Sequence, residues 1–207
     1  MLTLYYAPGT CALASHLALE YTGAPYEAKR LDFKQQQQRT PEYLRINPKG
    51  RVPALVTDRG VLTETPALLQ YIAQSFPAAQ LAPLDDAFLL GKVNEFNSYL
   101  CSTVHVNHAH KGRGYRWVQE TDTAALEAMK AKVPQTMAES FTLIEEKLLQ
   151  GPWVLGERFS TSDLYLYTLT RWLPGDGVDV QRFPKVAGHL RRMEAQPQVQ
   201  KIAALHA

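Results

Sequence analysis

The strongest constraint on the fold is a change of sequence pattern near residue 76. Before it, short β-prone runs alternate with apolar helical repeats. After it, apolar residues recur every three or four positions, which is typical of helices packed on one face. Residues 77–85 between the two parts contain Pro77 and Pro83 and show no periodicity. The sequence therefore predicts an α/β domain over residues 1–76, a linker over 77–85 and an all-helical domain over 86–207.

The first domain is expected to contain its elements in the order strand, helix, strand, helix, strand, strand, helix. The first strand, residues 3–6, ends at the breaker Ala7-Pro8-Gly9, and a helix begins near Thr10. Thr40-Pro41 predicts a helix start, and Arg59-Gly60 predicts the turn of a hairpin. The remaining expected segments are a strand over 26–31, the hairpin strands 52–56 and 61–63, and a helix that Thr65 caps.

The second domain is expected to be a bundle of helices. One apolar face runs over residues 89–104 and another over 126–148, where Pro134 predicts a kink or a break. The run from Ser160 to Asp163 is typical of a capping box at a helix start. Two further short helices are expected to open at Pro184 and Pro197.

Composition excludes several classes of protein. The formal net charge is only +2, which argues against a nucleic acid partner. Two cysteines are too few for a disulfide framework. No apolar run reaches the ~18 residues of a membrane span, and the first residues lack a basic segment ahead of an apolar one. We therefore expect a cytoplasmic protein without a membrane partner.

Cys11 follows a strand and a Pro-Gly turn at the start of a helix. The unpaired N–H groups and the dipole of a helix N-terminus favour an anion, so a thiolate or a bound sulfur would be stabilised there. On this basis the Cys11 thiol is expected to titrate below the ordinary value of ~8.5. The alternative is a small buried apolar side chain, which describes most free cysteines. Cys101, on the apolar face of a predicted helix, is expected to be such a core residue.

Two short motifs predict a peptide-like ligand. A proline that enters a strand, Pro53, marks an edge or a special turn, and a cis bond there would leave the preceding backbone free to pair with an extended peptide. Glu64 and Thr65 precede a helix whose N-terminus could bind a carboxylate, while Glu64 could receive an ammonium group. Plain helix capping by Thr65 is the alternative.

Four segments together resemble the bacterial beta-class glutathione transferases. They are residues 6–16 (YAPGTCALASH), 47–55 (NPKGRVPAL), 62–65 (LTET) and 156–163 (GERFSTSD). The resemblance extends over nearly the whole chain, with the motifs in order and at matching spacing. It implies an N-terminal thioredoxin-like domain followed by a C-terminal helical-bundle domain.

The resemblance also implies roles for individual residues. Cys11 and His105 would be catalytic, on either side of the glutathione sulfur. The residues implied to bind glutathione are Tyr6, Cys11, Lys34, Val52, Pro53 (cis), Glu64, Thr65 and His105, with Lys34 taking the glycyl carboxylate. Ala12 stands where many relatives have serine. Glutathione would be a substrate, so no cofactor is expected.

The function that this resemblance implies is conjugation of glutathione to a small electrophile by a homodimeric enzyme. Residues 89–104 would line the two-fold interface. One alternative is a glutathione-dependent thiol-disulfide oxidoreductase that uses Cys11 as its nucleophile. Another is a glutathione-transferase-like stress or scaffold protein without turnover.

The stretch between Glu95 and Glu120 contains no acidic residue. It carries Lys111, Arg113 and Arg116 and the histidines 105, 108 and 110. No cysteine, aspartate or glutamate lies within this histidine cluster, although most zinc sites include one. We therefore expect no metal. One interpretation is a solvated helix end, whose cations complement the helix dipole. The other is an electrophile site for an anionic substrate, formed by His108, Arg113, Arg116 and Trp117.

Overall fold

The computed structural model describes the whole chain, residues 1–207. Its first domain is built on a four-stranded sheet of order β2-β1-β3-β4. β1 (Leu2–Tyr6) pairs in parallel with β2 (Tyr26–Arg30) and antiparallel with β3 (Ala54–Thr57), which forms a hairpin with β4 (Gly60–Thr63). This mixed sheet confirms the predicted order of strands and the thioredoxin-like fold of the first domain.

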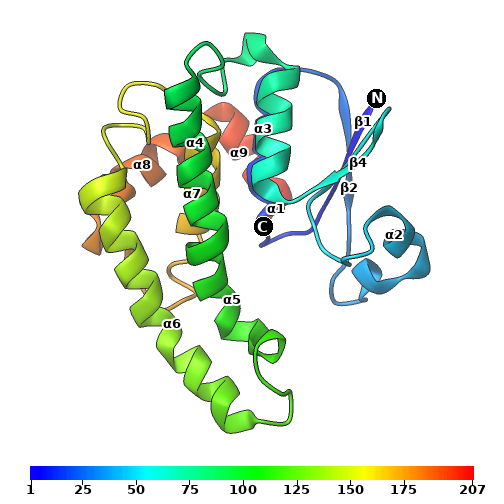
Figure 1. Cartoon of the computed structure of the whole chain (residues 1–207), viewed down its shortest axis with the longest axis vertical. Helices are drawn as coiled ribbons and strands as arrows, with labels where there is room; N and C mark the ends of the chain where they lie inside the picture. Colours follow the sequence, from blue (N-terminus) through cyan, green and yellow to red (C-terminus); the bar gives the residue numbers. More distant parts are fainter.

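Helices cover both faces of this sheet (Figure 1). α1 (Ala12–Thr22) and α3 (Thr65–Ser75) lie on one side, and α2 (Pro41–Ile46) lies on the other. Alternate side chains of a strand point to opposite faces. Leu4 of β1 therefore enters the core beneath α1, while the ring of its neighbour Tyr5 packs 5.5 Å from that of Tyr43 in α2.

The second domain is entirely helical, as predicted. After a short 3₁₀ turn η2 (Pro77–Ala79), α4 (Ala87–Tyr99) continues through a π-helical turn η3 (Leu100–Val104) into α5 (His105–Arg113). The remaining helical elements are η4 (Gly114–Arg116), α6 (Thr123–Leu143), η5 (Ile144–Leu148), α7 (Thr161–Thr170), η6 (Val180–Arg182), α8 (Pro184–Glu194) and α9 (Pro197–Leu205). None of these helices has the length and apolar character needed to cross a membrane.

Of the kink or break expected at Pro134, the structure contradicts the break. α6 runs without interruption from Thr123 to Leu143. Val133, Met137 and Phe141 are buried before and after the proline. Their packing on the core holds both halves of α6 in one helix despite the missing backbone donor.

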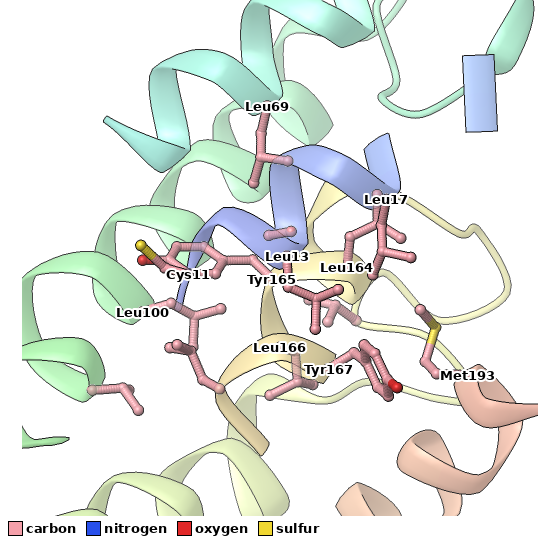
Figure 2. Packing of buried hydrophobic residues seen from close by; sticks show 14 of the residues in the cluster. Cys11, Leu13, Leu17, Leu69, Leu100, Leu164, Tyr165, Leu166, Tyr167 and Met193 are labelled. Carbon is pink, nitrogen blue, oxygen red and sulfur yellow. The ribbon is translucent and has the colours of Figure 1, made fainter. Parts of the chain in front are cut away.

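α7 is the central helix of the molecule, and all ten of its residues are buried. Its start is the predicted capping box: the Asp163 carboxylate accepts from the Ser160 N–H (2.8 Å), and the Ser160 hydroxyl accepts from the Ser162 N–H (3.2 Å). Leu164 and Leu166 of α7 share one apolar cluster with Leu13 and Leu17 of α1 (Figure 2). One continuous core therefore joins the two domains.

The end of the chain returns to the first domain. α9 packs on α1, and Nε2 of His206 lies 3.0 Å from Nδ1 of His16. Both rings pack against Tyr6, at 4.9 Å for His16 and 4.7 Å for His206. The last turn of the chain is thereby fixed behind β1.

Candidate functional site

A cavity of about 930 Å³ lies between the two domains. The first domain contributes the loop before α1, the turn before β3 and the start of α3; the second contributes η3, α5, η4 and α7. Most residues that the sequence singled out line this cavity: Cys11, Val52, Pro53, Glu64, Thr65, His105, His108, Arg113, Arg116 and Trp117.

Cys11 lies at the N-cap of α1 and is buried, with its sulfur pointing to the wall of the cavity. Its thiol donates a hydrogen bond to the Val52 carbonyl at 3.7 Å. Burial raises the pKa of this thiol to about 11, and hydrogen bonding to Thr65 and the charge of Arg113 only partly oppose it. The expectation of a lowered thiol pKa was therefore wrong, because desolvation outweighs the helix N-terminus.

Val52 joins Cys11 to the main chain of the opposite turn. The Val52–Pro53 bond is cis, as the resemblance implied. Val52 makes no backbone–backbone hydrogen bond, although it is only 8% exposed and lies in the cavity wall. Its N–H is therefore free to pair with an extended ligand, in the manner of an added strand.

Glu64 and Thr65 form the start of α3 beside this backbone. The helix begins at Thr65, so Glu64 and not Thr65 occupies the N-cap position, against the expectation of a threonine cap. Glu64 adopts a positive φ of 72°, a conformation that costs a non-glycine residue free energy and is found most often at functional sites. The Glu64 carboxylate accepts a hydrogen bond from Lys49 at 2.6 Å, while Thr65 is only 4% exposed.

His105 is the first residue of α5 and follows directly on the π-helical turn. Its Nδ1 lies 3.5 Å from the Tyr165 hydroxyl of α7, and its ring packs edge-on against Trp172 at 5.0 Å. Burial lowers the pKa of His105 to about 4, assisted by His108 and the arginines 113, 116 and 51. His105 is therefore a neutral imidazole at pH 7 and can donate or accept a hydrogen bond.

His108 is held by a buried carboxylate. Its Nδ1 lies 2.7 Å from Oδ2 of Asp176, which is 2% exposed, and its ring stacks on Trp172 at 4.1 Å. His110 instead packs edge-on against Trp117 at 4.5 Å. No group of three His, Cys, Asp or Glu side chains in the chain is placed to hold a metal ion.

Comparisons with known proteins identify the family. Residues 1–74 match the glutathione S-transferase N-terminal domain, and residues 99–197 match the C-terminal domain. The glutathione S-transferase GstA of Escherichia coli O157:H7 is 32% identical over 199 residues, which cover 95% of this chain and 94% of the relative. The chain belongs to the glutathione S-transferase family.

Solved structures of bacterial transferases have the same fold. A glutathione transferase homologue from Sulfitobacter, solved with bound glutathione, is 44% identical with a TM-score of 0.95, over 99% of this chain and 98% of that chain. A beta-class transferase from Sphingomonas chungbukensis is 28% identical with a TM-score of 0.83, over 99% and 98%. These comparisons confirm the resemblance to bacterial glutathione transferases that the four sequence motifs indicated.

Two residues that the resemblance placed at the glutathione site lie away from the cavity. Tyr6 is on the same face of β1 as Leu4, so its ring is buried against His16 and His206. Lys34 is exposed, because the Asp32 carboxylate accepts from its N–H at 2.8 Å and turns the loop outward. The 3₁₀ turn η1 (Gln37–Arg39) brings Gln38 and Arg39 to the cavity in place of Lys34.

Several residues that line the cavity were not predicted from the sequence. Cys101 was expected in the core, yet it is half-buried and lines the cavity from the π-helical turn. Tyr165 and Trp172 reach the same cavity from α7 and the turn after it, and no local signal marks either residue. Arg51 could have been found, since it precedes Val52 in the motif that was already singled out.

Proposed function

We propose that this transferase conjugates the thiol of reduced glutathione to small electrophiles. The observation that carries the proposal is the Val52 main chain, which is exposed to the cavity without a backbone partner, next to the start of α3. Its amide suits the cysteinyl unit of the tripeptide, and the α3 N-terminus with Glu64 suits the carboxylate and ammonium groups of the γ-glutamyl end. Thr65, buried beside this position, supplies a hydroxyl.

In the proposed reaction a bond forms between the glutathione sulfur and an electrophilic carbon. The thiol proton passes to solvent, and the leaving group departs with its electron pair. Cys11 and His105 support the developing thiolate as neutral hydrogen-bond donors. Cys11 donates already to the Val52 carbonyl, so its S–H lies beside the position proposed for the cysteinyl unit.

The raised pKa of Cys11, about 11, argues against the alternative of a thiol-disulfide oxidoreductase, because the thiolate is the attacking species in that reaction. A scaffold protein without turnover would need neither the unpaired Val52 N–H nor the strained backbone at Glu64. Conjugation therefore accounts for more of the site than either alternative.

A substrate panel tests the proposal. Purified protein with glutathione is assayed against halogenated nitroaromatics, epoxides, peroxides and mixed disulfides. We expect conjugation of at least one carbon electrophile, and Cys11→Ala to lower that activity without abolishing it, because the nucleophile is the sulfur of glutathione and His105 remains as a donor. Turnover of mixed disulfides alone, abolished in Cys11→Ala, would overturn the proposal in favour of the oxidoreductase. Cys101→Ala serves as the matched control for loss of a cavity thiol.

We also propose that the enzyme is a homodimer that pairs the first domain of one subunit with the second domain of the other. In the single chain, Phe88 on α4 is 74% exposed and Val61 on β4 is 41% exposed. The proposal rests mainly on Phe88, because aromatic residues are enriched in protein interfaces. Sedimentation at micromolar concentration is expected to give twice the chain mass of 23.2 kDa, and a monomer would contradict the proposal.

A further inference from the structure

The cavity carries an excess of positive charge. Glu64 is the only acidic residue that lines it, and it is already paired with Lys49. The cationic residues of the lining are Arg39, Arg51, Lys111, Arg113, Arg116 and Lys130. Two of these cations form an ion pair with a carboxylate, since Lys111 lies 3.5 Å from Asp176 and Lys130 lies 3.6 Å from Glu127. The arginines do not.

Arg51, Arg113 and Arg116 form no ion pair, and the one carboxylate of the cavity wall, that of Glu64, is taken by Lys49. The positive charges of Arg51 and Arg113 also repel that of Arg116. Burial lowers the pKa of Arg116, and the charges of Arg51 and Arg113 lower it further. Like charges gathered in a partly buried place raise the free energy of the site unless an anion joins them.

A solvated helix end does not explain this cluster. The dipole of α5 favours a cation in its last turn, which accounts for Arg113. It does not account for Arg51, which comes from the turn before β3 in the other domain. Arg113 and Arg116 are moreover half-buried and not free in solvent. An arginine from each domain at one cavity indicates a ligand that bears a negative charge.

We propose that Arg113 and Arg116, with Arg51 across the cavity, bind a carboxylate of the electrophile, so that the enzyme selects acidic electrophiles. A guanidinium fork matches a carboxylate with two hydrogen bonds. Trp117 lines the cavity beside them with 47% of its surface exposed, and Tyr115 does so with 46%. These rings would cover the apolar body of the substrate. The inference rests on the proposed function and names the substrate class of that site.

A matched pair of substrates tests the inference. The probes are 4-chloro-3,5-dinitrobenzoate and its carboxamide, which share one reacting carbon and differ in charge. Loss of a charged hydrogen bond predicts that Arg113→Ala or Arg116→Ala lowers kcat/KM for the benzoate roughly 10- to 150-fold, and that for the carboxamide much less. Arg116→Lys should restore part of the loss. Arg59→Ala, an exposed arginine outside the cavity, is the control for net charge.

Two outcomes would overturn the inference. Equal losses on both substrates would mean that the arginines do not recognise the carboxylate. A rise of the KM for glutathione with both substrates would mean that they hold glutathione itself.

A binding measurement separates this inference from the proposed function. If no electrophile of the panel is conjugated, these two included, the proposed function fails, and quenching of tryptophan fluorescence by 3,5-dinitrobenzoate and 3,5-dinitrobenzamide still tests the anion site. The benzoate is expected to bind at least about tenfold more tightly, a difference that Arg116→Ala should abolish. Equal binding of the two probes would overturn the inference independently of turnover.

Discussion

The two walls of the cavity are built from different groups. Around Cys11 the first domain presents main chain and short side chains, with Arg39 and Arg51 farther along the wall, and Cys11, Val52 and Thr65 are 7%, 8% and 4% exposed. The second domain presents long cations and aromatic rings, of which Trp117 is 47% exposed. The first wall is fixed by the sheet and by two helix starts, whereas the second depends on side chains at the end of α5.

This difference explains how one fold can bind the same thiol substrate in every relative while the electrophile differs between relatives. Groups of the first wall cannot change without disturbing the core, because they are buried among β1, β3 and α1. Arg113, Arg116 and Trp117 can be exchanged with little effect on packing, because their side chains lie at the surface of the cavity. We therefore assign glutathione to the first wall and the choice of electrophile to the second.

The largest effect is expected from breaking the support that both walls share. Asp163 at the start of α7 is completely buried and accepts from Ser160 N–H (2.8 Å), Val154 N–H (2.8 Å) and His189 Nε2 (3.2 Å). Asp163→Ala would leave these donors unpaired, and we expect the free energy of unfolding to fall by about 3–5 kcal/mol. Urea unfolding measures the loss, Asp163→Asn should lose less, and an unchanged midpoint for Asp163→Ala would contradict the assignment.

Local signals made much of the fold predictable from the sequence. The β3–β4 hairpin was predicted from Arg59-Gly60, and its turn lies one residue earlier, at Asp58-Arg59. Thr40-Pro41 marked the start of α2, and Ser160 with Asp163 marked that of α7. Each of these depends on residues within a few positions of one another. The first wall was predictable for the same reason, since its residues lie in short motifs at turns.

The second wall was less predictable because its geometry depends on contacts between distant segments. His105 meets Tyr165 across 60 positions, and His108 meets Asp176 across 68. The pKa of Cys11 was mispredicted for a related reason, since helix position is local and desolvation is not. Tyr6 and Lys34 were expected at the cavity but do not line it, because a motif does not specify which face of a strand or loop a side chain occupies.

Acid should lower the stability of the buried histidine pair that packs behind β1 in the first domain. Burial lowers the pKa of His16 to about 4 and that of His206 to about 3, from an ordinary histidine value of 6.5. Below pH 6.5 the two histidines bind protons in the unfolded chain but stay neutral in the native one. The stability of the buried neutral pair is therefore present above pH 6.5 and is lost as the pH falls toward 4.

Unfolding measurements between pH 7 and 5 should detect this decline, which we expect to be of the order of 1–3 kcal/mol. His206→Phe, which keeps a ring against Tyr6, should flatten the decline relative to the native chain. His110→Gln, at the edge of Trp117 and outside the core, is the matched control. An equal decline in His206→Phe would exclude the pair as its source.

The most direct test of the two-wall account is calorimetric binding of glutathione to Thr65→Val and Arg113→Ala. Thr65→Val keeps the volume of the buried side chain and removes its hydroxyl. The account predicts a rise of roughly tenfold or more in the Kd of glutathione for Thr65→Val, as for a lost hydrogen bond to a charged group. It predicts a change within about twofold for Arg113→Ala, since independent sites do not couple. A loss of affinity in Arg113→Ala equal to that in Thr65→Val would contradict it.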